Sequence, residues 1–380
     1  MKLASTLLVA CAGILLSIGL VMLYSSGIRP GATTGGARYL LMQLAWVGIG
    51  LITCAVAAGV DYRWLRKLAW PLLALSFILL VLILIPSVGI LKNGARRWLS
   101  VGFGNFQPSE LAKLALIVVL AWYCERHEEQ MRTWNWGLAR PGLVIAPMLA
   151  LIFIEPDRGT TILLAVISVI MLLTAGLRWL YVLPPVITAA MGLAYSLWRD
   201  PVRVKRILSW LYPESHKDGV GWQAWQGMIG LGSGGWTGLG LGNGRQKFGF
   251  IPEHHTDFIF SIIGEELGLV ATLSIIVLFI VLVFCGIYIA WNAADTFGLL
   301  LGTGITFLIG LQAFINIGVV TSLLPNKGLP LPFISYGGSN LLLMLTCVGI
   351  LFSIARHSSE ENCEMVRTLS SDEALATQQT

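Results

Sequence analysis

The sequence has 380 residues, of which 56% are hydrophobic and only 12% are charged, and its net charge is +5. Soluble domains carry about 25% charged residues, so a water-soluble globular protein is excluded because too little polar surface is available. The net charge alone says little about partners. The hydrophobic residues come in long blocks, which is typical of an integral membrane protein.

Most of these apolar blocks are long enough to cross a bilayer and are predicted to be transmembrane helices. The alternating pattern of a membrane β-barrel is absent, so helix is the expected state. The predicted spans are 3–24, 39–59, 68–90, 110–124, 141–154, 159–177, 179–198, 258–290, 297–323 and 336–355. The predicted fold is an all-α polytopic membrane protein with about ten transmembrane helices. The block at 141–154 is short, so it must be tilted, be surrounded by a thinned bilayer, or be extended by its neighbours.

The first block also resembles a signal peptide, and the residues before Cys11 loosely match a lipoprotein cleavage site. Because the apolar run continues well past Cys11 and many spans follow, an uncleaved first helix is the better interpretation. The six cysteines include no CxxC pair, which argues against a zinc site or a disulfide framework. They are expected to be small buried hydrophobic residues.

A large extracytoplasmic loop at 199–256 is predicted between the seventh and eighth spans, and it is too long to be a simple connector. We expect one transmembrane domain at 1–355, with both termini on one side and a flexible cytoplasmic tail at 356–380. The positive-inside bias is weak because many basic residues fall on the opposite, outer face. These residues indicate an anionic ligand on that face; ordinary solvated loop charge is the alternative.

A basic cluster precedes the fourth span in the segment KNGARRWLSVGFGNFQPSELAKLAL. Arg96 and Arg97 suit a pyrophosphate, because guanidinium groups grip phosphate oxygens in a fork. Pro108 is placed to open the next helix. Glu110 and Lys113 lie three residues apart on one helical face, where ionisable residues near a membrane edge are functional candidates. A structural ion pair that holds helices together is the alternative.

The turn EPDRG joins the fifth and sixth spans and is expected at the outer surface. Asp157 is a candidate substrate contact there, and a tight turn capped by the same residue is the alternative. The large loop then begins with RDPVRVKRILSWLYPESHKDG, in which Arg203 and Arg206 are interleaved with apolar residues. This pattern is typical of an amphipathic helix that lies on the membrane.

The second half of the loop, GWQAWQGMIGLGSGGWTGLGLGNGRQKFGF, is rich in glycine and contains Gln226, a candidate substrate contact. Gly230, Gly232 and Gly235 formally satisfy the dinucleotide motif GxGxxG. We reject that interpretation because no strand precedes the glycines and no strand–helix alternation surrounds them. We expect glycine here to permit tight turns close to a ligand or the bilayer.

The strongest candidate motif, IPEHHTDFIFSIIGEELG, lies where the chain re-enters the membrane. It places Glu253, His254, His255 and Asp257 at that point and two further glutamates inside the span. A carboxylate at a low-dielectric edge has a raised proton affinity, which a general base needs, so the carboxylates of this motif are candidate general bases. Histidines beside carboxylates also suit zinc, but four ligands are not evident.

The last polar segment, LLPNKGLPLPFISYGGSN, contains three prolines and two adjacent glycines that interrupt a regular helix. Broken backbone at membrane depth is tolerated only where it is buried in protein or lines a cavity. The residues expected to line such a cavity are Gln312, Asn316, Lys327, Ser335, Tyr336 and Ser339.

Together these segments resemble the SEDS family of bacterial cell-wall proteins (shape, elongation, division and sporulation). The matching strings occur in the family's order: NGARRWL, QPSELAK, EPDRGT, GSGG, PEHHTDFIF, GEELG and LPLPFISYGGS. NGARRW, IIGEELG and PNKG resemble the division branch, FtsW, or its sporulation relative SpoVE more than RodA. The family usually has Gln where Glu155 stands and a hydrophobic residue where Arg158 stands, so this chain departs from it in that turn.

The resemblance implies a glycosyltransferase that polymerises lipid II into glycan strands at the outer leaflet, in septal cell-wall synthesis, with inversion and release of undecaprenyl pyrophosphate. The family's essential acid maps onto Asp257 and its buried acid–base pair onto Glu110 and Lys113. Expected partners are a class B penicillin-binding transpeptidase and divisome membrane proteins, with no nucleic acid. The expected substrate contacts are Arg96, Arg97, Glu110, Lys113, Asp157, Arg203, Arg206, Gln226, His255, Lys327, Ser335 and Tyr336.

The same resemblance implies a divalent cation, Mg or Mn, with unknown ligands, and no organic cofactor. It places the protein in a bacterial cytoplasmic membrane with the active site on the extracytoplasmic side. Two other functions stay open. A lipid II flippase is one, because broken helices and intramembrane charges suit transport equally well. The other is a non-catalytic scaffold for a transpeptidase.

Overall fold

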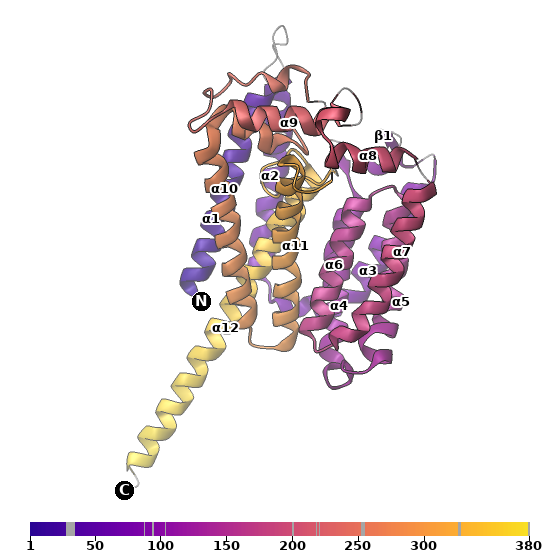
Figure 1. Cartoon of the computed structure of the whole chain (residues 1–380). Coiled ribbons are helices and arrows are strands. Elements are labelled where there is room, and N and C mark those ends of the chain that lie inside the picture. The colour runs from indigo at the N-terminus through magenta and orange to yellow at the C-terminus, as the bar shows by residue number, and fades with distance from the viewer. Residues whose placement is uncertain are drawn as a thin grey trace.

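The computed structural model describes residues 1–27, 35–86, 88–92, 95–102, 104–199, 201–217, 219, 221–251, 255–325 and 328–378. Helices dominate, and most of them run side by side as a bundle (Figure 1). In chain order the α-helices are α1 (Lys2–Ser26), α2 (Gly35–Gly59), α3 (Leu65–Leu84), α4 (Pro108–Arg126), α5 (Arg140–Ile154), α6 (Arg158–Thr174), α7 (Leu183–Arg199), α8 (Pro201–Leu211), α9 (Trp222–Ser233), α10 (Ile259–Trp291), α11 (Thr296–Val320) and α12 (Gly338–Gln378). Short helical turns are η1 (Tyr62–Trp64), η2 (Glu128–Gln130), η3 (Asn135–Ala139), η4 (Trp179–Val182), η5 (Glu214–His216) and η6 (Gln246–Phe248).

Seven helical segments in the described residues are long and apolar enough to cross a membrane: Lys2–Ser26, Tyr39–Gly59, Tyr62–Leu84, Asn135–Ile154, Ile259–Trp291, Thr296–Val320 and Gly338–Ser359. Of the alternatives for the short block at 141–154, the structure shows extension, because a π-helical turn, η3, continues it. The other three predicted spans form α4, α6 and α7. The polytopic helical fold is therefore confirmed, while the count of ten spans stays a prediction.

A small antiparallel sheet lies between α3 and α4, and the all-α prediction did not include it. Its strands are β1 (Ile90–Lys92), β2 (Ala95–Val101) and β3 (Gly104–Phe106), in the order β1-β2-β3. Helix α3 ends at Leu84, so the predicted span at 68–90 was too long by one helical turn and the start of a strand. The sheet places Arg96 and Arg97 on β2, at the end of the bundle where α4 begins.

The large loop between α7 and α10 folds into two helices, α8 and α9, which lie across one end of the bundle (Figure 1). The amphipathic segment is helical as predicted, over α8, and its location on the membrane surface stays a prediction. Helix α9 includes Gly230 and Gly232, so two of the glycines that match the dinucleotide motif are helical. This explains why the motif does not form a phosphate-binding turn there.

Helix α10 is broken at Gly268, whose φ of 75° and ψ of −170° are not helical. The freed backbone is paired with the glycine-rich segment that follows α9. Leu239 N–H donates to Glu265 O at 3.0 Å, and Leu269 N–H donates to Gly235 O at 2.9 Å. A Cβ on Gly268 would lie 2.4 Å from the backbone nitrogen of Gly238, so only glycine fits this crossing. The glycines do permit tight turns, and they make them against a broken helix.

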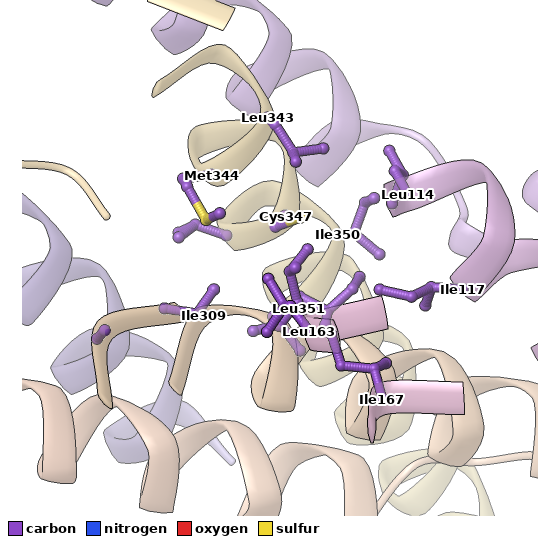
Figure 2. Close-up of a cluster of buried hydrophobic side chains, with 14 of the residues drawn as sticks. Leu114, Ile117, Leu163, Ile167, Ile309, Leu343, Met344, Cys347, Ile350 and Leu351 are labelled. Carbon is purple, nitrogen blue, oxygen red and sulfur yellow. The ribbon is translucent and has the colours of Figure 1, made fainter. Parts of the chain in front are cut away.

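The core lies where α4, α6, α11 and α12 meet, and Figure 2 shows part of it. Side chains that pack there are Leu114, Ile117, Leu163, Ile167, Ile309, Leu343, Met344, Cys347, Ile350 and Leu351. Four of the five described cysteines are buried, as expected for small hydrophobic side chains, and Cys54 is partly buried. Helix α12 runs unbroken from the core through the predicted tail to Gln378 (Figure 1). The flexibility of the tail stays a prediction.

Candidate functional site

The predicted catalytic residue, Asp257, lies in the turn that opens α10, at the end of the bundle crossed by α8 and α9. Asn316 of α11 holds this turn by donating from its side-chain amide to Asp257 O at 2.9 Å and to Leu329 O at 2.6 Å. A Cβ on Gly328 would lie 2.1 Å from Asp257 Oδ2, so the carboxylate packs against the backbone of the proline-rich segment. The structure thus joins two motifs that are some 70 residues apart.

The side chain of Asp257 is partly exposed, which leaves it accessible to a substrate. Ser335 is buried beside it and is committed to the backbone: its hydroxyl donates to Thr256 O at 2.6 Å and accepts from Leu331 N–H at 2.7 Å. Ser335 therefore fixes the turn that carries Asp257. Its predicted contact with substrate is not needed to explain its position.

His255 and Tyr336 form a half-exposed aromatic group with Tyr39 of α2. The ring centroids are 4.9 Å apart for Tyr39 and His255, 5.3 Å for Tyr39 and Tyr336, and 5.8 Å for His255 and Tyr336. Tyr336 N–H also donates to His255 O at 3.0 Å. Three chain segments thus supply an aromatic surface around His255, two residues before Asp257 in the chain. Such a surface suits the apolar face of a sugar ring.

Glu110 and Lys113 form the buried ion pair that the sequence predicted, with a distance of 2.8 Å between Lys113 Nζ and Glu110 Oε2. Lys113 also donates to Gln312 Oε1 at 2.9 Å, and the Asn340 side-chain amide donates to Glu110 Oε2 at 3.0 Å. The pair joins α4, α11 and α12. Buried charges persist only when they are paired and hydrogen-bonded in this way. The geometry fits the alternative of a structural pair, and contact with substrate stays a prediction.

Asp157 caps α6, as the alternative interpretation of the EPDRG turn proposed. Its carboxylate accepts from Thr160 N–H at 3.1 Å and from the Thr160 hydroxyl at 2.9 Å. Gln107, just before α4, donates to Asp157 Oδ2 at 3.3 Å, and its backbone N–H donates to the Ser339 hydroxyl at 3.0 Å. These contacts draw the QPSELAK, EPDRG and YGGSN motifs together.

The two adjacent arginines on β2 have different surroundings. Arg97 donates from Nε to Glu155 O at 3.0 Å and from Nη2 to Pro156 O at 2.6 Å, so it holds the α5–α6 turn. Arg96 instead lines a pocket of about 250 Å³, together with Glu155 and Pro156 of that turn. Of the predicted pair, Arg96 is therefore the residue with a guanidinium placed to meet a ligand.

Glu155 is 1% exposed, and neither carboxylate oxygen has a hydrogen-bond partner among the described residues. Burial raises the pKa of Glu155 to about 8; the negative charge of Asp157 adds to this rise, and Arg97 opposes it. The carboxyl is consequently neutral at pH 7 in most molecules. The sequence identified Glu155 only as a departure from the family pattern.

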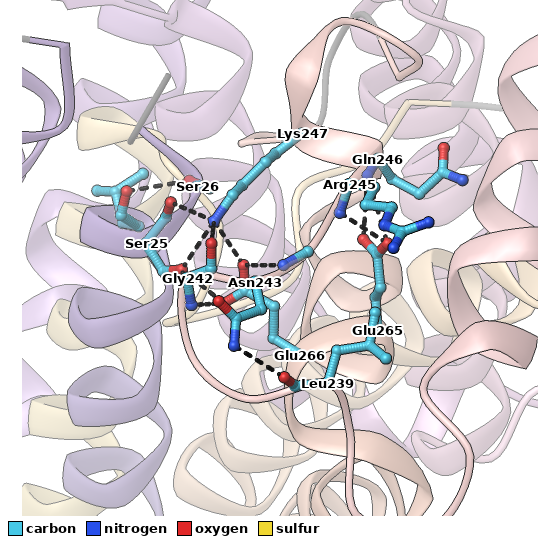
Figure 3. Close-up of polar contacts among 12 residues, drawn as sticks. Ser25, Ser26, Leu239, Gly242, Asn243, Arg245, Gln246, Lys247, Glu265 and Glu266 are labelled. Carbon is cyan, nitrogen blue, oxygen red and sulfur yellow. Dashed lines mark hydrogen bonds and ion pairs between the residues drawn. The ribbon is translucent and has the colours of Figure 1, made fainter. Parts of the chain in front are cut away.

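Two glutamates inside α10, Glu265 and Glu266, clamp the glycine-rich segment (Figure 3). Glu266 pairs with the fully buried Lys247 at 2.7 Å and accepts from Gly242 N–H at 3.0 Å and from the Ser25 hydroxyl at 2.5 Å. These contacts tie α1, α10 and the loop together at one point.

Glu265 completes the clamp by accepting from Arg245 N–H at 2.8 Å and from Gln246 N–H at 3.1 Å. The clamped residues end just before the segment that leads to Asp257. Sequence reasoning noted both glutamates but gave them no role. Their role could have been inferred from two features of the sequence. Two adjacent carboxylates lie in an apolar span and need partners, and Lys247 is a cation in the nearby glycine-rich segment.

Comparison with known proteins identifies the family. Residues 5–360 match the sequence profile of the FtsW/RodA/SpoVE group of cell cycle proteins. The chain belongs to this family. A probable peptidoglycan glycosyltransferase FtsW of Trichlorobacter lovleyi is 42% identical over 343 residues, with 90% of each chain covered. Stage V sporulation protein E of Bacillus subtilis is 39% identical over 354 residues, covering 93% of this chain and 97% of the relative.

Solved structures share the fold. A chain of a peptidoglycan synthase complex that coordinates polymerization and crosslinking matches with a TM-score of 0.78 and 29% identity, covering 92% of this chain and 97% of that one. Rod shape determining protein RodA of Thermus thermophilus matches with a TM-score of 0.67 and 28% identity, covering 92% and 95%. The chain is accordingly a multi-pass membrane protein of the SEDS family, and FtsW proteins are among the relatives that it resembles by sequence.

The remaining family-derived predictions are placed as follows. Gln226 is 8% exposed in α9, next to Gly227, which packs against Phe258 at the start of α10. Lys327 lies outside the described residues, as do the side chains of Arg203 and Arg206 in α8. In the described part of the chain, no group of three or more His, Cys, Asp or Glu side chains is placed to hold a metal ion.

Proposed function

We propose that this protein is a peptidoglycan glycosyltransferase that polymerises lipid II into glycan strands during septal cell-wall synthesis. Its family membership and its FtsW relatives support the activity. The assignment of the site rests on the position of Asp257. Its carboxylate is partly exposed, and Asn316, Ser335 and the backbone at Gly328 hold the turn that carries it at the start of α10.

The proposed reaction uses Asp257 as the general base. Its carboxylate removes the proton of the acceptor hydroxyl, and that oxygen attacks the anomeric carbon of the donor. The new carbon–oxygen bond forms as the bond from the anomeric carbon to the pyrophosphate breaks, with inversion. Because pyrophosphate leaves as a stable anion, one base suffices, and the guanidinium of Arg96 is the proposed partner of the departing negative charge.

The proposal includes the side of the membrane and the partners. The substrates enter from the outer leaflet of a bacterial cytoplasmic membrane, at the bundle end crossed by α8 and α9. A class B penicillin-binding transpeptidase and divisome membrane proteins are the proposed partners. Dependence on Mg or Mn remains part of the proposal, and polymerisation with a chelator and with each added cation tests it.

The decisive experiment compares wild type with Asp257→Asn in a lipid II polymerisation assay. The substitution keeps the shape of the side chain and removes its basicity, so glycan strands should be lost while folding persists. Asp61→Asn is the matched control. Asp61 caps η1 at the start of α3, and the sheet that carries Arg96 follows the end of α3, so Asp61 lies at the opposite end of the bundle from the candidate site. Full activity in Asp257→Asn would refute the assignment.

Transport of lipid II is the second candidate, and two observations favour it: the break in α10 at Gly268 and the buried pair of Glu110 and Lys113. Purified protein in detergent separates the two functions, since a transporter has no gradient or second leaflet there. Glycan polymer made in detergent supports the transferase. Lipid II movement in vesicles, without any polymer, would support the transporter.

A further inference from the structure

The pocket beside the α5–α6 turn has a chemical character of its own, and we call it the Arg96–Glu155 pocket. Its walls come from the end of α3, from β1 and β2, and from the turn, and it measures about 250 Å³. Its lining residues are Leu84, Leu91, Ala95, Arg96, Ile154, Glu155 and Pro156. The lining is thus largely apolar, with Leu84 and Ile154 at the ends of spanning helices, and it includes one guanidinium and one carboxyl group.

Both polar residues have unused hydrogen-bonding capacity. Neither oxygen of Glu155 has a hydrogen-bond partner among the described residues, although the side chain is almost completely buried. The buried Nε of Arg96 is likewise without a partner there. Buried polar groups that stay unpaired cost free energy, and such groups in a pocket are commonly satisfied by a ligand.

The surrounding charges decide which ligand fits. Arg97 lies on the other side of the turn and donates to Glu155 O and Pro156 O. Asp157 is satisfied by Thr160 and Gln107. Arg158 lies over the ring of Phe153, 5.8 Å from its centroid. With Glu155 neutral, the pocket therefore presents positive charge and one acidic O–H to a ligand that approaches along the apolar lining.

We propose that the Arg96–Glu155 pocket binds an ionised phosphate group of a membrane-borne lipid, with the Arg96 guanidinium and a protonated Glu155 carboxyl both donating to its oxygens. This inference rests on the proposed function where the phosphate is that of lipid II. The shared chemistry also admits an ordinary phospholipid such as phosphatidylglycerol. In both cases Glu155 acts as a donor only while it holds its proton, so binding is linked to pH.

The direction of this pH dependence follows from the charges of Glu155 and of the phosphate. Ionised Glu155 repels the phosphate and offers it no donor, so affinity falls as pH rises through the pKa of about 8. If only the protonated form binds, affinity at pH 9 is about tenfold lower than at pH 7. A phosphodiester or a substituted pyrophosphate stays ionised over this range, so the ligand itself adds no pH dependence.

The test measures binding of lipid II and of phosphatidylglycerol to purified full-length protein in detergent between pH 6.5 and pH 9. Wild type should weaken about tenfold from pH 7 to pH 9, Glu155→Gln should bind with no such dependence, and Arg96→Gln should bind weakly throughout. Preference for lipid II identifies a substrate subsite, and equal binding identifies a general phospholipid site. Parallel pH profiles for wild type and Glu155→Gln, or full affinity in Arg96→Gln, would overturn the proposal.

A second measurement needs no variant. Titration calorimetry of wild type at pH 8.5 in two buffers with different ionisation enthalpies should reveal proton uptake when lipid II binds, and its absence would also overturn the proposal. Asp257→Asn separates this inference from the proposed reaction. That variant should bind lipid II with the wild-type pH profile while making no polymer. If it were fully active, the general base would be wrong and the pocket result would stand.

Discussion

Two of the described lysines, Lys113 and Lys247, have no exposed side-chain surface, and each pairs with a glutamate inside the bundle. Transferring such charges out of water costs several kcal/mol per ion, and only a complete set of partners offsets that cost. Lys113 has Glu110 and Gln312. Lys247 has Glu266 and two backbone carbonyls. Both pairs therefore fix how helices meet at the candidate site.

We expect Lys113→Met to lower the free energy of unfolding by about 3–5 kcal/mol, because it leaves the Glu110 carboxylate buried without its cation. The double variant Glu110→Gln with Lys113→Met should lose clearly less, since no charge then stays unpaired. Lys67→Met, at an exposed position on α3, is the matched control. Thermal unfolding in detergent measures all four proteins. Equal stability of Lys113→Met and wild type would show that the pair is dispensable for folding.

Glu155 makes stability depend on pH in a defined window. Its pKa is raised from 4.5 to about 8 in the folded protein. Between these values the unfolded chain ionises the carboxyl and the folded chain keeps it protonated, so stability falls as pH rises. Glu155→Gln should remove this dependence and be more stable at pH 8, by on the order of 1–3 kcal/mol. Unfolding midpoints from pH 5 to pH 8 test this; identical slopes for the two proteins would contradict it.

At the scale of single residues, the sequence was sufficient for groups whose partners are local. Glu110 and Lys113 are three residues apart on one helix, and Asp157 caps the helix that follows it, so spacing alone predicted both interactions. The partners of Asp257 come from α11 and from the segment before α12. No local pattern encodes such contacts.

Among the elements, the glycine-rich segment and broken α10 depend on each other. The sequence predicted one span at 258–290 and did not indicate the break at Gly268. Its break is stable because backbone groups from 234–240 replace the missing helical hydrogen bonds. The sheet of β1, β2 and β3 was missed for a related reason. Strands of three to seven residues carry little pattern of their own, and their stability comes from pairing with one another.

The crossing of the loop over α10 makes Gly238 far less replaceable than Gly232. Gly238 has a φ of 81°, and a Cβ there would lie 2.1 Å from Glu266 O. Gly238→Ala should cost more than the roughly 1–2 kcal/mol of a left-handed alanine alone. Gly232, in α9, has open space around it, so Gly232→Ala should be neutral or gain about 0.5–1 kcal/mol.

Limited proteolysis within 234–249, together with thermal unfolding, compares these two alanine variants. Faster cleavage is expected in Gly238→Ala only, because its loop no longer fits against the broken helix. Polymerisation should fall in the same variant, since the loop leads directly to the segment that carries Asp257. Equal cleavage of both variants would mean that the loop does not depend on this crossing.

At the scale of the whole molecule, the two ends of the bundle are chemically different. One end has Asp257, the Arg96–Glu155 pocket and the helices α8 and α9. The other end has a compact polar junction around Asp295, which caps α11 and accepts hydrogen bonds from Tyr62 at 2.9 Å and from Arg63 at 3.1 Å. Arg66 joins Asp295 to Glu125 at the same place. The first end combines the partly exposed Asp257 with a pocket in which atoms of Arg96 and Glu155 have no hydrogen-bond partner among the described residues.

Because the two ends of the bundle differ, the orientation of the protein in the membrane can be tested. The weak bias of basic residues in the sequence did not settle this orientation. Helices α4 and α10 both begin at the candidate site. Glu129 follows the end of α4 and therefore lies at the opposite end of the bundle, whereas Trp236 lies near the start of α10, where the glycine-rich segment crosses that helix. Both positions are exposed. In a background with Cys54→Ser and Cys363→Ser, we expect a membrane-impermeant maleimide to label Trp236→Cys in intact cells and Glu129→Cys only after permeabilisation. The reverse pattern would place Asp257 toward the cytosol, where a lipid-linked sugar of the outer leaflet cannot reach it, and the proposed polymerisation would then have no substrate at its base.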